Sequence, residues 1–419
     1  MNKVESYVYN MVRKNPKLKQ WVRDAYQGVF DLLPRQKEFF KNDYQCNEGY
    51  FFGFHDVSPF SADETKVLAC HASFDFSMPR QLEGLEIGYF EFKDGRMGAY
   101  HKLGHSYAWN WHKGCRLQWL DNDTFIYNTA IDRQLKACID TIGGKSRIID
   151  YPIDSVYYTQ ERQLATSFSY ERLQRCMPGY GYPYRHEGSV EECAPKDDGL
   201  YLIDLQANTR ELLVSLHDLS LTADDADARD YLHFVTHTEF SGDGRYISFL
   251  YRRTALRNAE QQAMLTRLVI YDLQSKTLHT LPTENSGSHY VWTRQGKIVG
   301  SFILSGMSCH ALFDVQDDTC QVVAPEILNS DGHQTMLGDM AFITDTYPDK
   351  RRMARLYRVD IPSGKVELLA NTYSPKRFQT RHLDCHIACD LHPRVSPSGK
   401  YLSFDSPRTG KRGLYVMKL

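Results

Sequence analysis

Residues 237–249 read HTEFSGDGRYISF, and residues 392–404, near the other end of the chain, read HPRVSPSGKYLSF. Each stretch places a histidine three residues before an apolar residue, and a polar turn and an alternating, β-rich run follow. The same order recurs from HYVW (289–292) and from HQTM (333–336). Alternating runs joined by polar, glycine-containing turns predict β-hairpins. The chain therefore repeats one hairpin unit.

A second hairpin follows each of the first three, at 268–281, 311–324 and 356–370. The aligned histidines are 52, 44 and 59 residues apart, which is close to the length of a four-stranded propeller blade with loop insertions. Weaker copies of the pattern lie before residue 237 and bring the total to seven. We therefore predict an all-β fold, a seven-bladed β-propeller.

The two ends of the predicted propeller differ from its middle. The last repeat stops after three strands, at GLYVMKL, so we expect the segment around 44–53 to supply its fourth strand and remove an exposed sheet edge. Earlier apolar residues have helical spacing, and Pro34 ends the pattern. This divides the chain into a short N-terminal helical extension, 1–43, and a propeller, 44–419. The apolar residues of the extension are Trp21, Val22, Tyr26, Val29, Phe30 and Leu33.

Composition narrows the class of protein. The 419 residues include 50 basic and 52 acidic side chains, so the net charge is −2 and no basic footprint for nucleic acid is present. No apolar run reaches the roughly 18 residues of a membrane span, and charged residues interrupt the N-terminus. The ten cysteines lack a disulfide-like spacing. We expect a cytoplasmic protein without membrane insertion or a nucleic-acid partner.

The repeated histidines form the first candidate site. Innermost strands of a propeller line its axis, so equivalent positions in different blades converge. His237, His289, His333 and His392 occupy one repeat position and should form a ring, which His55 of the first blade can join at the rim. A lone histidine is usually structural, but four in register favour a functional channel.

A second cluster, RHLDCHIACDLH at 381–392, is dense in metal-binding residue types. Asp390 and His392 project to the same side of an extended strand, and His386 can reach them from the preceding loop. Imidazole and carboxylate together suit manganese, zinc or iron. A structural zinc at the CxxxC pair and a polar loop without metal remain the alternatives, since a second cysteine pair is absent.

Other side chains could complete an active site. Arg252 and Arg253 close the first hairpin of the fourth blade, where a guanidinium can bind a carboxylate or simply face solvent. Tyr347, in TDTYPDKRR, follows the blade-six hairpin and could enter the site or form an ordinary turn. Tyr184, in the stretch YGYPYRH, could stack on a sugar ring or pack in a lid.

With these residues in place, the sequence resembles the oligogalacturonate lyases, seven-bladed propeller enzymes of pectin breakdown, and more loosely other propeller-type polysaccharide lyases. The resemblance spans about 45–419, and its sharper parts are HYVW, DGHQT with DTYPD, and DLHPRVSPSG. It implies manganese bound by histidines and a glutamine, a histidine base, and an arginine on the substrate carboxylate.

Transferred to this chain, the resemblance implies His333 and His392 as metal ligands, His289 as the base, and Arg252 or Arg253 as the carboxylate clamp. The chain departs from the pattern at Asp390, where the family leads us to expect a histidine. The expected glutamine is also missing near Ile387, which leaves His386 or Gln334 as substitutes.

The function predicted from these features is a lyase that cleaves uronate-containing, acidic oligosaccharides by metal-assisted β-elimination, with Mn²⁺ or Zn²⁺ as the metal. Abstraction of the C5 proton by a neutral histidine requires charge stabilisation at the neighbouring carboxylate. Tyr347, water or His237 could protonate the leaving sugar, and His55, Arg252 and Tyr184 could bind substrate. The alternatives are another metal-dependent sugar enzyme of surface-polysaccharide metabolism and a non-catalytic propeller that binds a glycan or protein.

Overall fold

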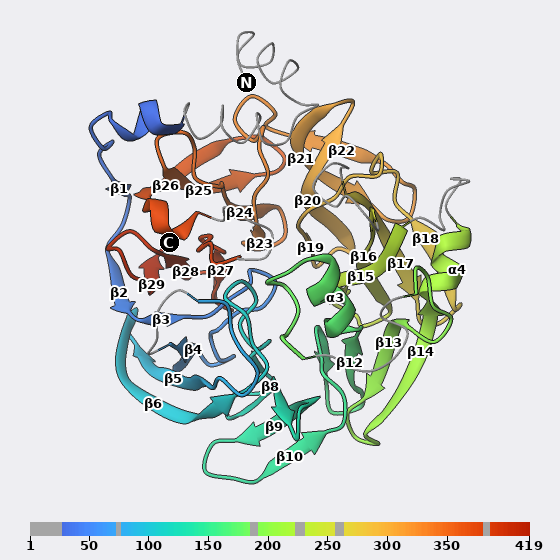
Figure 1. Ribbon diagram of the computed structural model, residues 1–419. Coiled ribbons are helices and arrows are strands. Elements are labelled where there is room, and N and C mark those ends of the chain that lie inside the picture. Colours follow the sequence, from blue (N-terminus) through green and yellow to red (C-terminus); the bar gives the residue numbers. More distant parts are fainter. Residues whose placement is uncertain (1–26, 73–76, 185–191, 223–230, 256–263, 380–385) are drawn as a thin grey trace.

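The structure is a computed structural model that describes residues 27–72, 77–184, 192–222, 231–255, 264–379 and 386–419. Within these ranges the chain forms seven antiparallel sheets arranged as blades around one axis, in sequence order (Figure 1). The predicted seven-bladed propeller is confirmed. No helix in these ranges is long and apolar enough to span a membrane.

The first three blades each contain four strands, and the first strand of each lies nearest the axis. Blade 1 comprises β3 (Tyr50–Phe51), β4 (Lys66–His71), β5 (Leu85–Lys93) and β6 (Arg96–Ser106). Blade 2 comprises β7 (Gln118–Trp119), β8 (Thr124–Ile131), β9 (Gln134–Thr141) and β10 (Ser146–Ile149). Blade 3 comprises β11 (Val156–Tyr158), β12 (Gln163–Ser167), β13 (Gly199–Asp204) and β14 (Thr209–Ser215), with helix α3 (Tyr170–Cys176) between β12 and β13.

Blades 4 to 6 follow the same plan. Helix α4 (Leu216–Leu221) leads into blade 4, which comprises β15 (Tyr231–Phe240), β16 (Tyr246–Ala255), β17 (Leu265–Asp272) and β18 (Thr277–Thr280). Blade 5 comprises β19 (Tyr290–Trp292), β20 (Lys297–Leu304), β21 (Met307–Asp314) and β22 (Cys320–Val323). Blade 6 comprises β23 (Gln334–Met336), β24 (Ala341–Asp345), β25 (Met353–Asp360) and β26 (Val366–Tyr373), and a 3₁₀ helix, η3 (Lys376–Phe378), follows it.

Blade 7 joins the two ends of the described chain. Strands β27 (Arg394–Val395), β28 (Tyr401–Ser406) and β29 (Gly413–Lys418) pair with β2 (Tyr44–Glu48), which lies on the outer edge. The register of β2 on β29 runs from Tyr44 opposite Met417 to Glu48 opposite Gly413. This confirms the predicted fourth strand. The short β1 (Phe39–Phe40) also adds a fifth strand to blade 6, which the sequence did not suggest.

The turn chemistry explains why the first hairpins of blades 4 and 7 look alike in sequence. The Ser241 hydroxyl accepts a hydrogen bond from the Tyr246 amide at 2.9 Å, and the Ser396 hydroxyl accepts one from the Tyr401 amide at 3.2 Å. Gly244 completes its turn with a φ of +66°, a conformation that favours glycine. The two similar sequences therefore form the same type of turn.

Only part of the predicted N-terminal helix lies in the described residues. Residues 27–31 are helical and end before Pro34, whereas Trp21, Val22 and Tyr26 lie outside the described ranges. Val29 is 61% exposed. Ion pairs connect the described part of the segment to the propeller: Asp31 with Arg352 at 2.7 Å and Glu38 with Arg408 at 2.7 Å.

A buried ion pair lies at the junction of blades 7 and 1. Arg394 is fully buried and donates to Asp405 at 3.2 Å and to the Gly53 carbonyl at 2.9 Å. Asp405 in turn accepts the Phe52 and Gly53 amides, each at 3.2 Å. The two side chains thus fix the backbone that leads into the axis.

We expect Asp405→Ala to lower the free energy of unfolding by about 3–5 kcal/mol, because it leaves the Arg394 guanidinium buried without its carboxylate. Chemical denaturation measures this change. The matched control, Glu91→Ala, removes a carboxylate paired with exposed His101 and should change stability by no more than about 0.5 kcal/mol. Equal effects of the two substitutions would contradict the assigned role of Asp405.

Candidate metal centre and active site

The axis of the propeller is filled by one aromatic ring. Phe54 is 3% exposed, and six histidine rings of the described chain surround it with centroids 4.5–5.9 Å away. Gly53 makes this possible: its φ is +126°, and a Cβ there would meet the Lys113 carbonyl carbon at 2.8 Å. The surrounding histidines are His55, His112, His237, His289, His333 and His392.

Each of these histidines comes from a different blade. His55 follows β3 of blade 1, and His112 precedes β7 of blade 2. His289 and His333 directly precede β19 and β23, and His392 lies two residues before β27. His237 lies within β15, where the pairing with β16 shifts register, and its φ is +53°. The predicted convergence of the four aligned histidines and His55 is therefore observed, and His112 of blade 2 joins them.

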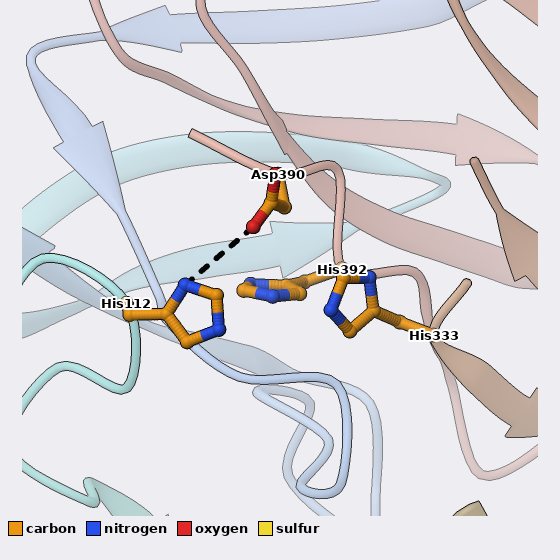
Figure 2. A group of neighbouring side chains, drawn as sticks. All are labelled: His112, His333, Asp390 and His392. Atoms are coloured by element: carbon orange, nitrogen blue, oxygen red, sulfur yellow. Dashed lines mark ion pairs between the residues drawn. The ribbon is translucent and has the colours of Figure 1, made fainter. Parts of the chain in front are cut away.

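Four buried side chains of this region form a compact group that we call the His/Asp group. The potential ligand atoms of His112, His333, Asp390 and His392 all lie within 4.8 Å of one another. Figure 2 shows the three imidazoles and the carboxylate facing a common point, with Asp390 directed at His112. The Nδ1 of His112 and the nearer carboxylate oxygen of Asp390 are 3.5 Å apart.

Hydrogen bonds fix the orientation of two of these imidazoles. His333 donates from Nδ1 to Asp345 at 2.8 Å, and His392 donates from Nδ1 to the Gly53 carbonyl at 2.8 Å. Asp345 also accepts the backbone amides of both histidines, at 2.8 and 3.0 Å. Each Nε2 is thereby left as a lone-pair donor, and neither has a hydrogen-bond partner in the described structure. This arrangement is typical of metal-ligating histidine.

Burial keeps two of the imidazoles of the group unprotonated and leaves its carboxylate poorly solvated. Burial lowers the pKa of His112 and His392 well below the usual value. Burial opposes protonation of His333 as well, but the Asp345 carboxylate more than offsets it and raises its pKa. Burial raises the pKa of Asp390 to about 6. A divalent cation would stabilise the ionised carboxylate and use the free imidazole nitrogens, so the residues fit such an ion.

The observed group differs from the predicted ligand set in one member. His333, His392 and Asp390 come together as expected, but the fourth position is taken by His112. His386 lies one layer further out, where its Nε2 is 3.1 Å from the Tyr180 hydroxyl and its ring centroid is 4.9 Å from that of His112. His112 does not occupy the repeat position of the other histidines, so no pattern in the sequence marks it.

A histidine–aspartate pair adjoins the His/Asp group. His289 donates from Nδ1 to Asp331 at 3.2 Å, and Ser288 donates to the other oxygen of Asp331 at 2.7 Å. The His289 ring centroid is 4.0 Å from that of His333. Burial, reinforced by His333, lowers the pKa of His289 to about 4, so the ring is neutral near pH 7. Its Nε2 can then accept a proton. Asp331 was not singled out from the sequence, although it directly precedes GHQT.

The two candidate arginines have different surroundings. Arg252 is 7% exposed and donates to the Gly287 and Ser288 carbonyls at 3.3 and 3.5 Å, which places its guanidinium beside the segment that carries His289. Its Nε has no hydrogen-bond partner in the part of the chain that the structure describes. Arg253 projects from the other face of β16 and lies 4.7 Å over the Tyr231 ring. The geometry thus favours Arg252 for a carboxylate.

The remaining candidates divide between the axis and the core. Tyr347 is 39% exposed, and its ring centroid lies 5.5 Å from that of His333. His55 and His237 lie 5.6 and 5.9 Å from His289 by the same measure. The structure places Tyr184 in the core, 2% exposed, with its hydroxyl donating to the Tyr107 carbonyl at 2.7 Å.

This position corrects the predicted stacking role of Tyr184, because a ligand in the channel cannot reach a ring buried in the core. Tyr180, from the same stretch, is the ring that contacts the axis, with its centroid 4.4 Å from that of His112.

The ligand set can be tested by metal binding. We expect added Mn²⁺ or Zn²⁺ to raise the unfolding temperature of the unmodified protein and of His386→Ala, because the His/Asp group is intact in both. The same ions should not stabilise His112→Ala. At a free ion concentration of 100 times the Kd, binding stabilises the folded protein by about 2.7 kcal/mol. Loss of the response in His386→Ala, with retention in His112→Ala, would contradict the assignment.

Solved structures with a similar fold are known. No protein-family model matches the chain, and no curated protein matches it. Among solved structures, an oligogalacturonate lyase from Vibrio parahaemolyticus is 11% identical, with a TM-score of 0.58, and the match covers 92% of this chain and 98% of the other. An oligogalacturonate lyase in complex with manganese is 12% identical, with a TM-score of 0.61 and the same coverage. The chain therefore has the propeller fold of oligogalacturonate lyase structures over more than nine-tenths of its length.

Proposed function

We propose that the protein is a lyase that cleaves uronate-containing oligosaccharides by metal-assisted β-elimination. The observation that carries this proposal is the neutral, buried imidazole of His289, hydrogen-bonded to the Asp331 carboxylate and adjacent to the His/Asp group. A base of this kind beside a cation site suits removal of a weakly acidic proton next to a carboxylate. The similar fold of oligogalacturonate lyases, one of them solved with manganese, supports the same reading.

The His/Asp group would hold the metal through His112, His333, Asp390 and His392, with Mn²⁺ or Zn²⁺ as candidates. When bound, the ion would supply positive charge to the uronate carboxylate and so lower the cost of carbanion character at C5. Asp345 orients two of the four ligands, because its carboxylate binds both the ring and the amide of His333 and the amide of His392.

His289 would act as the base. Its Nδ1 proton is held by Asp331, so its Nε2 can take the C5 proton of the uronate. The electron pair of the C5–H bond forms the C4–C5 double bond, and the bond between C4 and the glycosidic oxygen breaks. Asp331 stabilises the resulting imidazolium and keeps the ring in its productive tautomer.

Arg252 would bind the uronate carboxylate through its unoccupied Nε. Its position beside Gly287 and Ser288 brings the guanidinium to the same side as the base, so the carboxylate and the C5 proton are held together. The departing oxygen needs a proton, which Tyr347, His237 or water can donate. Tyr347 is partly exposed beside His333 and is the side chain that a leaving sugar reaches from solvent.

The elimination is tested by incubating the metal-loaded protein with oligomers of galacturonate, glucuronate and mannuronate and following the ultraviolet absorbance of the unsaturated product. We expect His289→Ala to lower kcat by about 10²–10⁴-fold with unchanged metal binding, since it removes a general base. The control His279→Ala alters an exposed histidine paired with Asp318 and should be active. New reducing ends without an absorbance rise would identify a hydrolase instead, and bound metal without any turnover would contradict an enzymatic role on these sugars.

A further inference from the structure

A cavity of about 220 Å³ lies beside the His/Asp group, on the side of blades 6 and 7. Asp390 and His386 form one end of it, and Tyr347 and Arg352 contribute from the connection between β24 and β25. Ser374 and Gln379, which flank η3, and Gln27 of the N-terminal segment line the rest. None of these residues belongs to the predicted carboxylate clamp, because Arg252 lies in blade 4.

We propose that this cavity binds one neutral, hydroxyl-rich sugar unit, the one joined to O4 of the reacting uronate. The inference rests on the proposed lyase function and adds a substrate preference to it: the chain cleaves a uronate whose leaving neighbour carries no carboxylate.

Two charged side chains of the cavity wall are already engaged in ion pairs. The Arg352 guanidinium on the cavity wall is already occupied, because Nε and Nη2 donate to the two oxygens of Asp31 at 2.7 and 3.0 Å and Nη1 donates to Gln379 at 3.2 Å. Asp349 is likewise paired with Arg355 at 2.7 Å. Among the described residues that line the cavity, the one guanidinium is therefore already paired, so an incoming carboxylate finds no free arginine or lysine there.

The groups that face the cavity suit a sugar unit without charge. Within the described ranges, neither the Gln379 amide nitrogen nor the Tyr347 hydroxyl has a hydrogen-bond partner, and the Tyr347 ring is the most exposed aromatic surface near the His/Asp group. An amide, hydroxyls and an aromatic face are the groups that recognise a sugar without charge. Gln27 is fixed by its donation to Asp31 at 3.0 Å, which closes the wall.

The size and position of the cavity fit a single sugar ring. Pockets for larger ligands measure roughly 300–1,000 Å³, so a cavity of about 220 Å³ accepts a single ring rather than a chain. Tyr347 contacts His333 on one side and lines the cavity on the other. A sugar in the cavity therefore lies against the residue placed to protonate the departing oxygen.

The test compares two disaccharides that share the reacting uronate and differ only in the leaving unit, a neutral hexose or a second uronate. We expect kcat/KM to be at least tenfold higher for the neutral unit. Gln379→Ala should raise KM for that substrate and leave kcat nearly unchanged, because it removes binding that is equal in the ground and transition states. A preference of the unmodified protein for the second uronate would overturn the inference while leaving the lyase function standing.

A reciprocal variant separates charge from shape. Asp31→Asn keeps the size of the side chain but releases the Arg352 cation toward the cavity, so the preference should shift toward the acidic leaving unit by about tenfold or more. Glu91→Ala, far from the cavity, should leave the ratio of the two substrates unchanged. An unchanged ratio in Asp31→Asn would contradict the assigned role of the Asp31–Arg352 pair.

Binding alone distinguishes this inference from the lyase proposal. Methyl hexoside should bind the metal-free protein in saturation-transfer experiments, and Gln379→Ala should abolish the signal. If the glycoside binds in this way and neither disaccharide is cleaved, the cavity assignment stands and the lyase proposal fails. If the unmodified protein does not bind the glycoside, the cavity assignment fails whatever the activity.

Discussion

The structure depends on the closure of the ring of blades. Every inner strand faces the axis only because its two neighbouring blades hold it there, and the circle is completed by the pairing of β2 with β29. At the same junction, Arg394 and Asp405 bind the backbone of Phe52 and Gly53, which leads directly to Phe54. The hydrogen bonds that close the fold thus also position the centre of the site.

Burying six imidazoles around Phe54 is tolerable because most of them are neutral. Burial lowers the pKa of His55 and His237 as it does for His112 and His392, and only His333, beside Asp345, shifts the other way. A neutral imidazole keeps a lone pair on one ring nitrogen. Where no hydrogen-bond donor faces that lone pair, a bound cation can stabilise the buried nitrogen. The same desolvation keeps His289 unprotonated near pH 7, so its Nε2 is free to accept a proton.

The fold was predictable because one turn geometry recurs with nearly the same residues. The turns at Ser241 and Ser396 are an example. His333 and His392 followed from their register in that repeat, and Asp390 followed from its place two residues before His392 in a stretch dense in metal-binding residue types. His112 did not, because it lies nine positions before the turn that begins at Asp121, whereas His237 lies four positions before its own turn at Ser241. Tyr184 was misplaced because a tyrosine-rich stretch does not reveal which ring turns inward. Asp331 and the cavity near Gln379 arise from contacts between segments that no local pattern contains.

The pairing of Tyr44 with Met417 has a consequence for biosynthesis. Residues 39–48 leave the ribosome early, yet their partners in blades 6 and 7 are made last, so the ring cannot close during translation of the intervening blades. Pairing over such a separation carries a large loop-closure cost and is slow. Until then blade 7 has an open edge, and the His/Asp group is incomplete, since His392 arrives with it. The nascent chain therefore has its greatest need of protection from aggregation just before synthesis ends.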